Sequence, residues 1–243
     1  MRAFFSRPSN RLFIAVSSAL IAIKLLFDFY PGDFPGRDQA AAFTWTLVAS
    51  IVLLGLAGLF ADRAARLPDP FADSARERRG AFWAAGLGAF YGIVTIAMYV
   101  WHPTNSPLGN GSGWDHMALP WSLAFYAFGA IFLEFLLRLG ALCILFWLVH
   151  VAVLRRHLRL TVFWILSAII ALYEIWPYMA ANVHAGRWDQ VALSLLEPLY
   201  LSNVLEAGLL LRFGWFAPIV FRLAFYLVWH ILFGGFARPF FGH

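Results

Sequence analysis

Charged residues are scarce in this chain of 243 residues, of which 13% are Asp, Glu, Lys or Arg. A soluble domain carries about 25% charged residues, and so few polar side chains do not cover the surface of a soluble monomer. Cys143 is the single cysteine, which excludes a disulfide-stapled scaffold. Glycine and proline, at 19 and 12 residues, are too ordinary for a collagen or a disordered chain.

Hydrophobic residues dominate the rest of the composition. They make up 62% of the chain, and the mean hydropathy is +0.73, which is typical of a polytopic membrane protein. We therefore expect an all-α fold, a bundle of transmembrane helices that forms a single integral membrane domain over residues 1–243. Apolar stretches of about twenty residues or more, enough to cross about 30 Å of hydrocarbon, mark the expected spans. They cover residues 11–30, 41–61, 81–101, 118–154, 160–180, 190–211 and 215–236.

The stretch 118–154 is 37 residues long, which is too long for one simple span. It is either one very long helix or two segments broken near Gly129 or Gly140. If it crosses once, the chain has seven spans, and a cytoplasmic N-terminus places twelve arginines on inner loops and three on outer loops. If it crosses twice, there are eight spans and the split is ten to five. The positive-inside rule favours seven spans with a cytoplasmic N-terminus.

The net charge of +5 does not indicate nucleic-acid binding. Arginine accounts for 17 of the 18 basic residues, and most arginines lie between apolar blocks, where they flank membrane segments. The expected partner of these charges is therefore membrane lipid. The polar connector 62–80 should face the cytoplasm, and the loop 102–117, which has neither Lys nor Arg, should lie outside.

Ionisable side chains inside the expected spans are candidates for a functional site, because burying them in a bilayer is costly. Glu134 and Arg138 are four residues apart, so they share one helix face, with the acid before the base as an ion pair prefers. The pair belongs either to a functional site or to a structural clamp. Lys24 and His150 lie within reach of an interface, where their polar ends can approach the headgroups.

The last expected span carries a polar stripe on an otherwise apolar helix. Arg222, Tyr226 and His230 follow one another at a spacing of four residues, which aligns them on one face. A stripe facing lipid is unfavourable, so we expect it to face the bundle interior, with Asn203 and Glu206 as partners. Interhelical hydrogen bonding that only holds the bundle together is the structural alternative.

Common catalytic and metal-binding motifs are missing from the sequence. There is no HExxH, CxxC, Walker loop or GxSxG. His116 beside Asp115 and His184 near Asp189 have no second ligand at metal spacing. We therefore expect no cofactor from the residues themselves.

The segment from Phe125 to Leu148 reads FYAFGAIFLEFLLRLGALCILFWL. It resembles the first motif of the CPBP intramembrane proteases, a family that contains CAAX prenyl endopeptidases and bacteriocin-processing enzymes. Members typically read Tyr-Gly-Gly-x-x-Glu-Glu-x-Leu-Leu-Arg-x-Gly at this place. The residues that fall on the pattern are Gly129, Glu134, Leu136, Leu137, Arg138 and Gly140.

Two later blocks extend the resemblance, which covers a CPBP-like core over residues 118–236. The segment 208–230 is similar to the last conserved helix of the family, with Arg212, Gly214 and His230 aligned. The segment 171–177, ALYEIWP, lies where the family places a Phe-x-x-x-His motif. A metal is possible by this resemblance, although no ligand set is visible in the sequence.

The residues that do the chemistry in the family are replaced in this chain. In the family, the first glutamate of the pair and the second-motif histidine activate water, and the third motif helps to build the site and stabilise the oxyanion. Leu133 stands at the position of the first glutamate, and Glu174 or Ile175 is nearest to the second-motif histidine. Arg222 and Tyr226 occupy the His and Asp/Asn positions of the third motif.

The resemblance therefore implies a protease-type bundle that has lost its usual catalytic residues and acts as a binding or scaffolding pseudoenzyme for a membrane protein or peptide. An active endopeptidase of altered mechanism is the alternative; its candidate catalytic residues are Glu134, Glu174, Arg222 and His230, supported by Arg138, Asn203, Glu206 and Tyr226. A small transporter or channel is the second alternative, with a polar path lined by Glu134, Glu174, Glu197 and Glu206. We expect the protein in a bacterial plasma membrane.

Overall fold

A computed structural model describes residues 7–34, 36–69, 74–101, 119–189, 191 and 198–237. All regular secondary structure in these ranges is helical. Three of the elements, labelled η, are π-helices, in which hydrogen bonds join residue i to residue i+5. In chain order the elements are α2 (Pro8–Phe29), α3 (Arg37–Ala42), α4 (Trp45–Ala64), α5 (Ser74–Trp101), α6 (Trp121–Glu134), η1 (Phe135–Leu142), α7 (Cys143–Phe146), η2 (Trp147–Val153), α8 (Arg159–His184), α10 (Pro198–Phe213), α11 (Phe216–Tyr226) and η3 (Leu227–Ala237).

Six helical stretches in the described ranges are long and apolar enough to cross a membrane. They run over Pro8–Phe29, Trp45–Ala64, Arg78–Met98, Trp121–Val153, Arg159–Pro177 and Phe216–Gly235. This confirms the expectation of an all-helical integral membrane protein. The seventh expected span, 190–211, is described mainly through α10, which has 16 residues and is short for a crossing. Seven crossings therefore stay a prediction.

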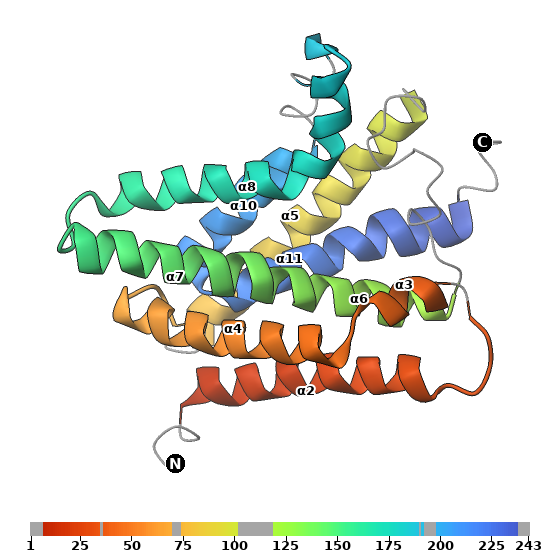
Figure 1. The fold of residues 1–243 in the computed structure, drawn as a ribbon, viewed down its shortest axis with the longest axis horizontal. Helices are drawn as coiled ribbons and strands as arrows, with labels where there is room; N and C mark the ends of the chain where they lie inside the picture. Colours follow the sequence, from red (N-terminus) through yellow and green to blue (C-terminus); the bar gives the residue numbers. More distant parts are fainter. Residues whose placement is uncertain are drawn as a thin grey trace.

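The long apolar stretch forms one uninterrupted helical rod, made of α6, η1, α7 and η2 and drawn in green in Figure 1. The rod does not break at Gly129 or Gly140, so the very long helix is the arrangement found. Its 33 residues exceed the roughly 20 that a simple span needs. Two of its four segments are π-helical, and the first of them starts directly after Glu134.

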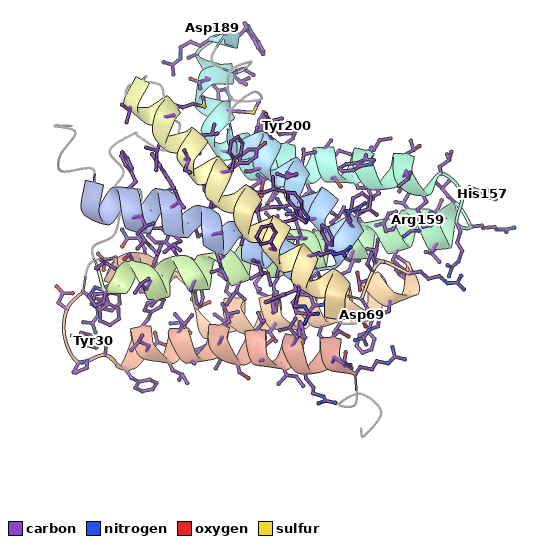
Figure 2. All side chains as sticks on the ribbon, turned by 180° about the vertical axis from the view of Figure 1, so that it is seen from behind. Tyr30, Asp69, His157, Arg159, Asp189 and Tyr200 are labelled. Atoms are coloured by element: carbon purple, nitrogen blue, oxygen red, sulfur yellow. The ribbon has the colours of Figure 1, made fainter. Side chains whose placement is uncertain are left out.

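Helix α11 lies in the middle of the bundle and contacts α5, α6 and α10 (Figure 1). On one side of the rod, α4 packs against η1, and α2 packs against α6. On the other side, α8 contacts α10 and η1. Figure 2 shows Tyr30 at one end of the bundle and both His157 and Arg159 at the other. Segments far apart in the sequence therefore meet around α11 and η1.

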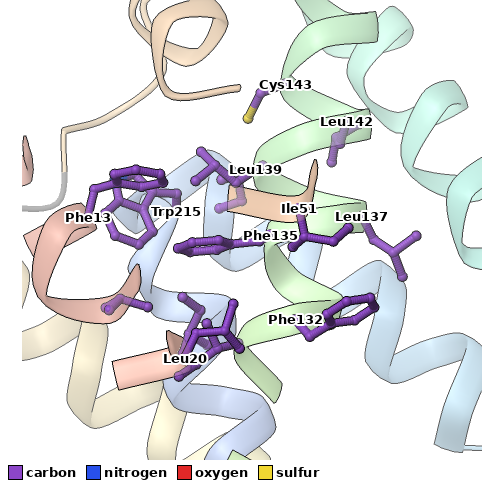
Figure 3. Close-up of a cluster of buried hydrophobic side chains, with 14 of the residues drawn as sticks. Phe13, Leu20, Ile51, Phe132, Phe135, Leu137, Leu139, Leu142, Cys143 and Trp215 are labelled. Atoms are coloured by element: carbon purple, nitrogen blue, oxygen red, sulfur yellow. The ribbon is translucent and has the colours of Figure 1, made fainter. Parts of the chain in front are cut away.

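Aromatic rings fill the core between α2, the rod and the start of α11 (Figure 3). The rings of Phe13 and Phe135 are stacked with centroids 5.2 Å apart, and Trp215 meets both edge-on at 6.3 Å. Leu20, Ile51 and other aliphatic side chains close the same cluster. Because lipid tails are as apolar as these residues, shape-matched packing rather than water exclusion stabilises such a contact inside a membrane.

Two glycines allow helices to approach at backbone distance. A Cβ on Gly58 of α4 would lie 1.8 Å from the carbonyl oxygen of Leu139, and one on Gly88 of α5 would lie 2.1 Å from that of Phe221. Small residues at helix contacts are a general device of membrane bundles. Leu139 follows Arg138, and Phe221 precedes Arg222, so both contacts fix helices at the positions that carry the buried arginines.

Candidate functional site

Six polar residues from the rod, α8, α10 and α11 converge in one network, which we call the buried ion network. Five of them are nearly inaccessible to solvent, since the exposed fractions of Glu134, Arg138, Asn203 and Glu206 are 1% and that of Arg222 is 5%. The sixth is Glu174 of α8, whose side chain is 10% exposed. The stretches that carry these residues are apolar, so the bundle satisfies the polar groups by turning them toward one another.

Arg222 contacts every acid of the network. Its Nε donates to Oε1 of Glu134 at 2.6 Å, and its Nη1 donates to Oε1 of Glu174 at 2.9 Å. Its Nη2 donates to Oε2 of Glu206 at 2.7 Å and to Oδ1 of Asn203 at 3.0 Å. All three guanidinium nitrogens are therefore used, and one side chain joins the rod, α8 and α10 to α11.

Arg138 reaches Glu174, Asn203 and Glu206 from the rod. Its Nη1 donates to Oε2 of Glu174 at 2.9 Å, and its Nη2 donates to the backbone oxygen of Asn203 at 3.2 Å. The same Nη2 also donates to Oδ1 of Asn203 and to Oε2 of Glu206. Glu174 thus gives one carboxylate oxygen to each arginine, whereas Glu206 and Asn203 each offer a single oxygen to both.

The ion pair expected between Glu134 and Arg138 is present only as a long contact. Oε2 of Glu134 lies 3.9 Å from Nε of Arg138, while the closest partner of Glu134 is Arg222 at 2.6 Å. Arg138 lies in the π-helix η1, which begins at Phe135 directly after Glu134. The shortest contacts of both arginines are with acceptors on other helices.

The formal charges of the network do not balance, because three carboxyl groups face two guanidinium groups. Among the described residues, Oε2 of Glu134 and Nδ2 of Asn203 are buried without a hydrogen-bond partner. Charges in a low-dielectric interior interact strongly, and removing one partner leaves the others uncompensated. The charged groups of the network therefore depend strongly on one another, and two of its polar atoms make no hydrogen bond.

Tyr226, the last residue of α11, interacts with the guanidinium group of Arg222 at the edge of the network, and His230 follows in η3. The ring of His230 is stacked on Tyr126 with centroids 4.1 Å apart and meets the ring of Tyr226 edge-on at 5.1 Å. His230 is 7% exposed. The polar stripe predicted for this helix is therefore divided, since Arg222 enters the ion network and His230 enters an aromatic cluster.

Tyr126 is a member of this cluster that the sequence analysis did not single out. It lies in α6, eight residues before Glu134. No feature of the sequence around Tyr126 sets it apart from the other aromatic residues of this helix.

The remaining predicted polar positions have local partners or lie outside the described ranges. Lys24 forms an ion pair with Asp28 and lies 5.5 Å from the ring centre of Trp45. Nδ1 of His150 lies 3.1 Å from the backbone oxygen of His157. Glu197, one of the acids of the expected transport path, lies outside the described residues, as do His116, Asp115 and the loop 102–117.

No group of three or more His, Cys, Asp or Glu residues in the described part of the chain is arranged to hold a metal ion. The three glutamates of the network direct their oxygens to guanidinium groups instead. They could hold a metal only if Arg138 and Arg222 moved away, because hard cations and zinc need those same oxygens.

The function of this chain has to be inferred from these contacts, since comparison with known proteins gives no relative. No protein-family model, curated protein or solved structure matches the chain. The resemblance to CPBP proteases accordingly stays a prediction that rests on the quoted residues.

Proposed function

We propose that this chain is a CPBP-like membrane protein in which a hydrolytic site has become an ion network, and that it acts as a binding or scaffolding pseudoenzyme. The observation that carries the proposal is the contact of Arg222 with all three glutamates and Asn203. By the resemblance, Arg222 stands where the family has a histidine of the third motif.

The chemistry of the network favours a non-catalytic role. A general base needs a carboxylate or imidazole that is free to accept a proton beside the scissile bond. Glu174 and Glu206 each interact with both arginines, and Glu134 is bonded to Arg222. An arginine remains protonated and supplies donors only, so Arg222 cannot activate water. A set of acids held in this way supports a fixed helix arrangement better than proton transfer.

Leu133 adds an independent argument. It occupies the position of the first glutamate of the family motif, and its side chain packs against the apolar core. A leucine has no group that can accept a proton, so the water-activating role that the resemblance gives this position is lost.

Peptide cleavage by the purified protein tests the proposal. The full chain in detergent is incubated with a peptide library that includes C-terminally prenylated peptides, next to Glu174→Ala and His230→Ala variants and an unrelated CPBP protease with the intact Glu-Glu motif. We expect cleavage by the control protease and none by this chain. Cleavage that disappears in either variant would overturn the proposal and support the active endopeptidase, whereas cleavage unchanged in both variants would identify a contaminant.

The active endopeptidase has one observation in its favour. Glu174 is the most accessible acid of the network and would serve as the base, with Arg222 stabilising the oxyanion and His230 moving the proton. The transport alternative is less well supported, because Glu134, Glu174 and Glu206 gather around the same two arginines instead of following one another along a path.

A further inference from the structure

Two turns at one end of the bundle bring exposed basic side chains together. One turn follows α4 and contains Arg66; the other joins η2 to α8 and contains Arg155, Arg156 and His157, with Arg159 at the start of α8. All five side chains are exposed. Figure 2 shows His157 and Arg159 at this end, opposite to Tyr30. We call these five residues the basic rim.

Cross-turn hydrogen bonds hold the rim together. Nη2 of Arg156 donates to the backbone oxygen of Ala64 at 3.3 Å, and Nη2 of Arg159 donates to that of Arg66 at 3.2 Å. Arg66, Arg155 and Arg156 have φ angles of 56°, 47° and 72°, in the left-handed region that side chains with a Cβ disfavour. Such conformations persist where the surrounding structure imposes them, often at binding sites. The two turns are therefore held against one another, which keeps their cations close together.

None of the acids that the structure describes forms an ion pair with the cations of the rim. Within the described part of the chain, no hydrogen bond or ion pair involves the side chains of Arg66 and Arg155. Asp62, at the end of α4, is buried, and Asp69 accepts a hydrogen bond from Ser9. The rim thus presents guanidinium donors that are available to an anion.

Apolar side chains border the same cations. Val153, Leu158 and Leu160 are 66%, 63% and 59% exposed, and they lie before, between and after the arginines of the turn between η2 and α8. A free phosphate ion has no apolar part that these side chains could contact, whereas a phospholipid places acyl carbon beside its phosphate. The arginines therefore match the headgroup of a phospholipid, and the apolar side chains match its acyl chains.

We propose that the basic rim binds the phosphate headgroup of an anionic phospholipid. Guanidinium groups pair with phosphate oxygens through two parallel hydrogen bonds, which fixes the headgroup more tightly than a point charge does. Basic clusters between helices at the cytoplasmic surface are a general means of retaining anionic lipids. Val153, Leu158 and Leu160 contact the upper acyl carbons. The proposal is independent of whether the ion network is catalytic.

Lipid retention by the full chain tests this site. The protein in a neutral detergent is titrated with phosphatidylglycerol, with phosphatidylcholine and with inorganic phosphate, and bound molecules are counted by native mass spectrometry. We expect preferential binding of phosphatidylglycerol and no displacement by equimolar phosphate. The double variant Arg66→Gln/Arg155→Gln should weaken phosphatidylglycerol binding by roughly fivefold for each arginine removed.

The matched control is Arg37→Gln/Arg187→Gln, which removes the same charge from exposed positions outside the rim. This variant should bind phosphatidylglycerol as the unchanged protein does, and circular dichroism should show that both variants remain helical. Equal retention of phosphatidylcholine, an equal loss in the control variant, or binding of phosphate alone in competition with lipid would each overturn the proposal.

Discussion

The planar fork of Arg222 explains how one side chain serves three acids. A guanidinium group presents five N–H donors in fixed directions, and here all three of its nitrogens donate. A lysine carries its three donors on a single nitrogen and lacks the planar fork that directs donors to the rod, α8 and α10. Arg138 is used in the same way from the opposite side. Position 222 is therefore specific for arginine and not merely for positive charge.

Replacing Arg222 should strongly destabilise the bundle. Arg222→Gln leaves three buried carboxyl groups with Arg138 as the remaining guanidinium partner in the network, and Arg222→Lys loses most of the hydrogen bonds. Breaking a buried ion pair by removing one partner costs about 3–5 kcal/mol. We expect a large drop in the thermal unfolding midpoint of the detergent-solubilised protein for both variants. Arg187→Gln, at an exposed position, is the control and should leave the midpoint unchanged.

A second substitution tests whether the loss of stability in Arg222→Gln comes from the charge imbalance of the buried ion network. Glu134→Gln can still accept from Nε of Arg222, and its amide takes the place of the oxygen that has no hydrogen bond. The network then has two carboxyl groups for two guanidinium groups. Glu134→Gln should reduce the cost of Arg222→Gln, so the double variant should be more stable than the sum of the two effects predicts. Simple additivity would contradict this explanation.

At the scale of elements, π-helical segments border two residues of the candidate site. η1 starts directly after Glu134 and η3 directly after Tyr226, so each follows a residue of interest. π-helical turns are rare and are frequently found at functional sites. α-Helical spacing predicts a contact between Glu134 and Arg138, and the two side chains do approach to 3.9 Å. Apart from Arg138, residues Phe135–Leu142 are apolar and suit either helix type, so nothing in the local sequence could reveal the wider turn.

Close helix contacts at glycine lead to a prediction for α4. Gly58→Ala places a methyl group 1.8 Å from the carbonyl oxygen of Leu139, and this backbone atom can move only with the whole rod. We expect a loss of about 1–3 kcal/mol or more, as for other overpacked interiors, measured as a lower thermal midpoint. Gly86→Ala in α5 is the matched control, because its added Cβ meets nothing within 4 Å. The control should be neutral or slightly stabilising, since alanine favours helix. Equal midpoints for the two variants would contradict the close packing.

At the scale of the whole molecule, the apolar outer surface fits a membrane environment. Phe29, Phe82 and Tyr173 are more than 70% exposed, which water would disfavour and lipid favours. The apolar surface was predictable, because the composition and the length of the apolar stretches can be read from the sequence alone. The members of the ion network were also named from the sequence, since charges in apolar runs are conspicuous. Part of their pairing was predicted as well, since Arg222 does contact Asn203 and Glu206. The contacts of Arg222 with Glu134 and Glu174 were not predictable, because they depend on which helices are neighbours.

Thiol labelling tests the orientation expected from the arginine distribution. Arg155→Cys and Arg187→Cys place single reactive thiols at opposite ends of α8, while the native Cys143 is buried. With a cytoplasmic N-terminus, a membrane-impermeant reagent added to intact cells should label Arg187→Cys at once and Arg155→Cys only after lysis. The unchanged protein controls for Cys143. The opposite labelling pattern would reverse the orientation, and labelling of both positions in intact cells would exclude seven crossings with α8 as one of them.

The glycine contacts have a consequence for the evolution of the chain. Gly58 and Gly88 are far from Arg138 and Arg222 in sequence, yet each sets how closely its helix approaches the residue next to one of those arginines. Selection that maintains the ion network therefore also acts on both glycines. In related sequences we expect the four positions to change together, with larger residues at 58 and 88 appearing only in lineages that have lost the arginines.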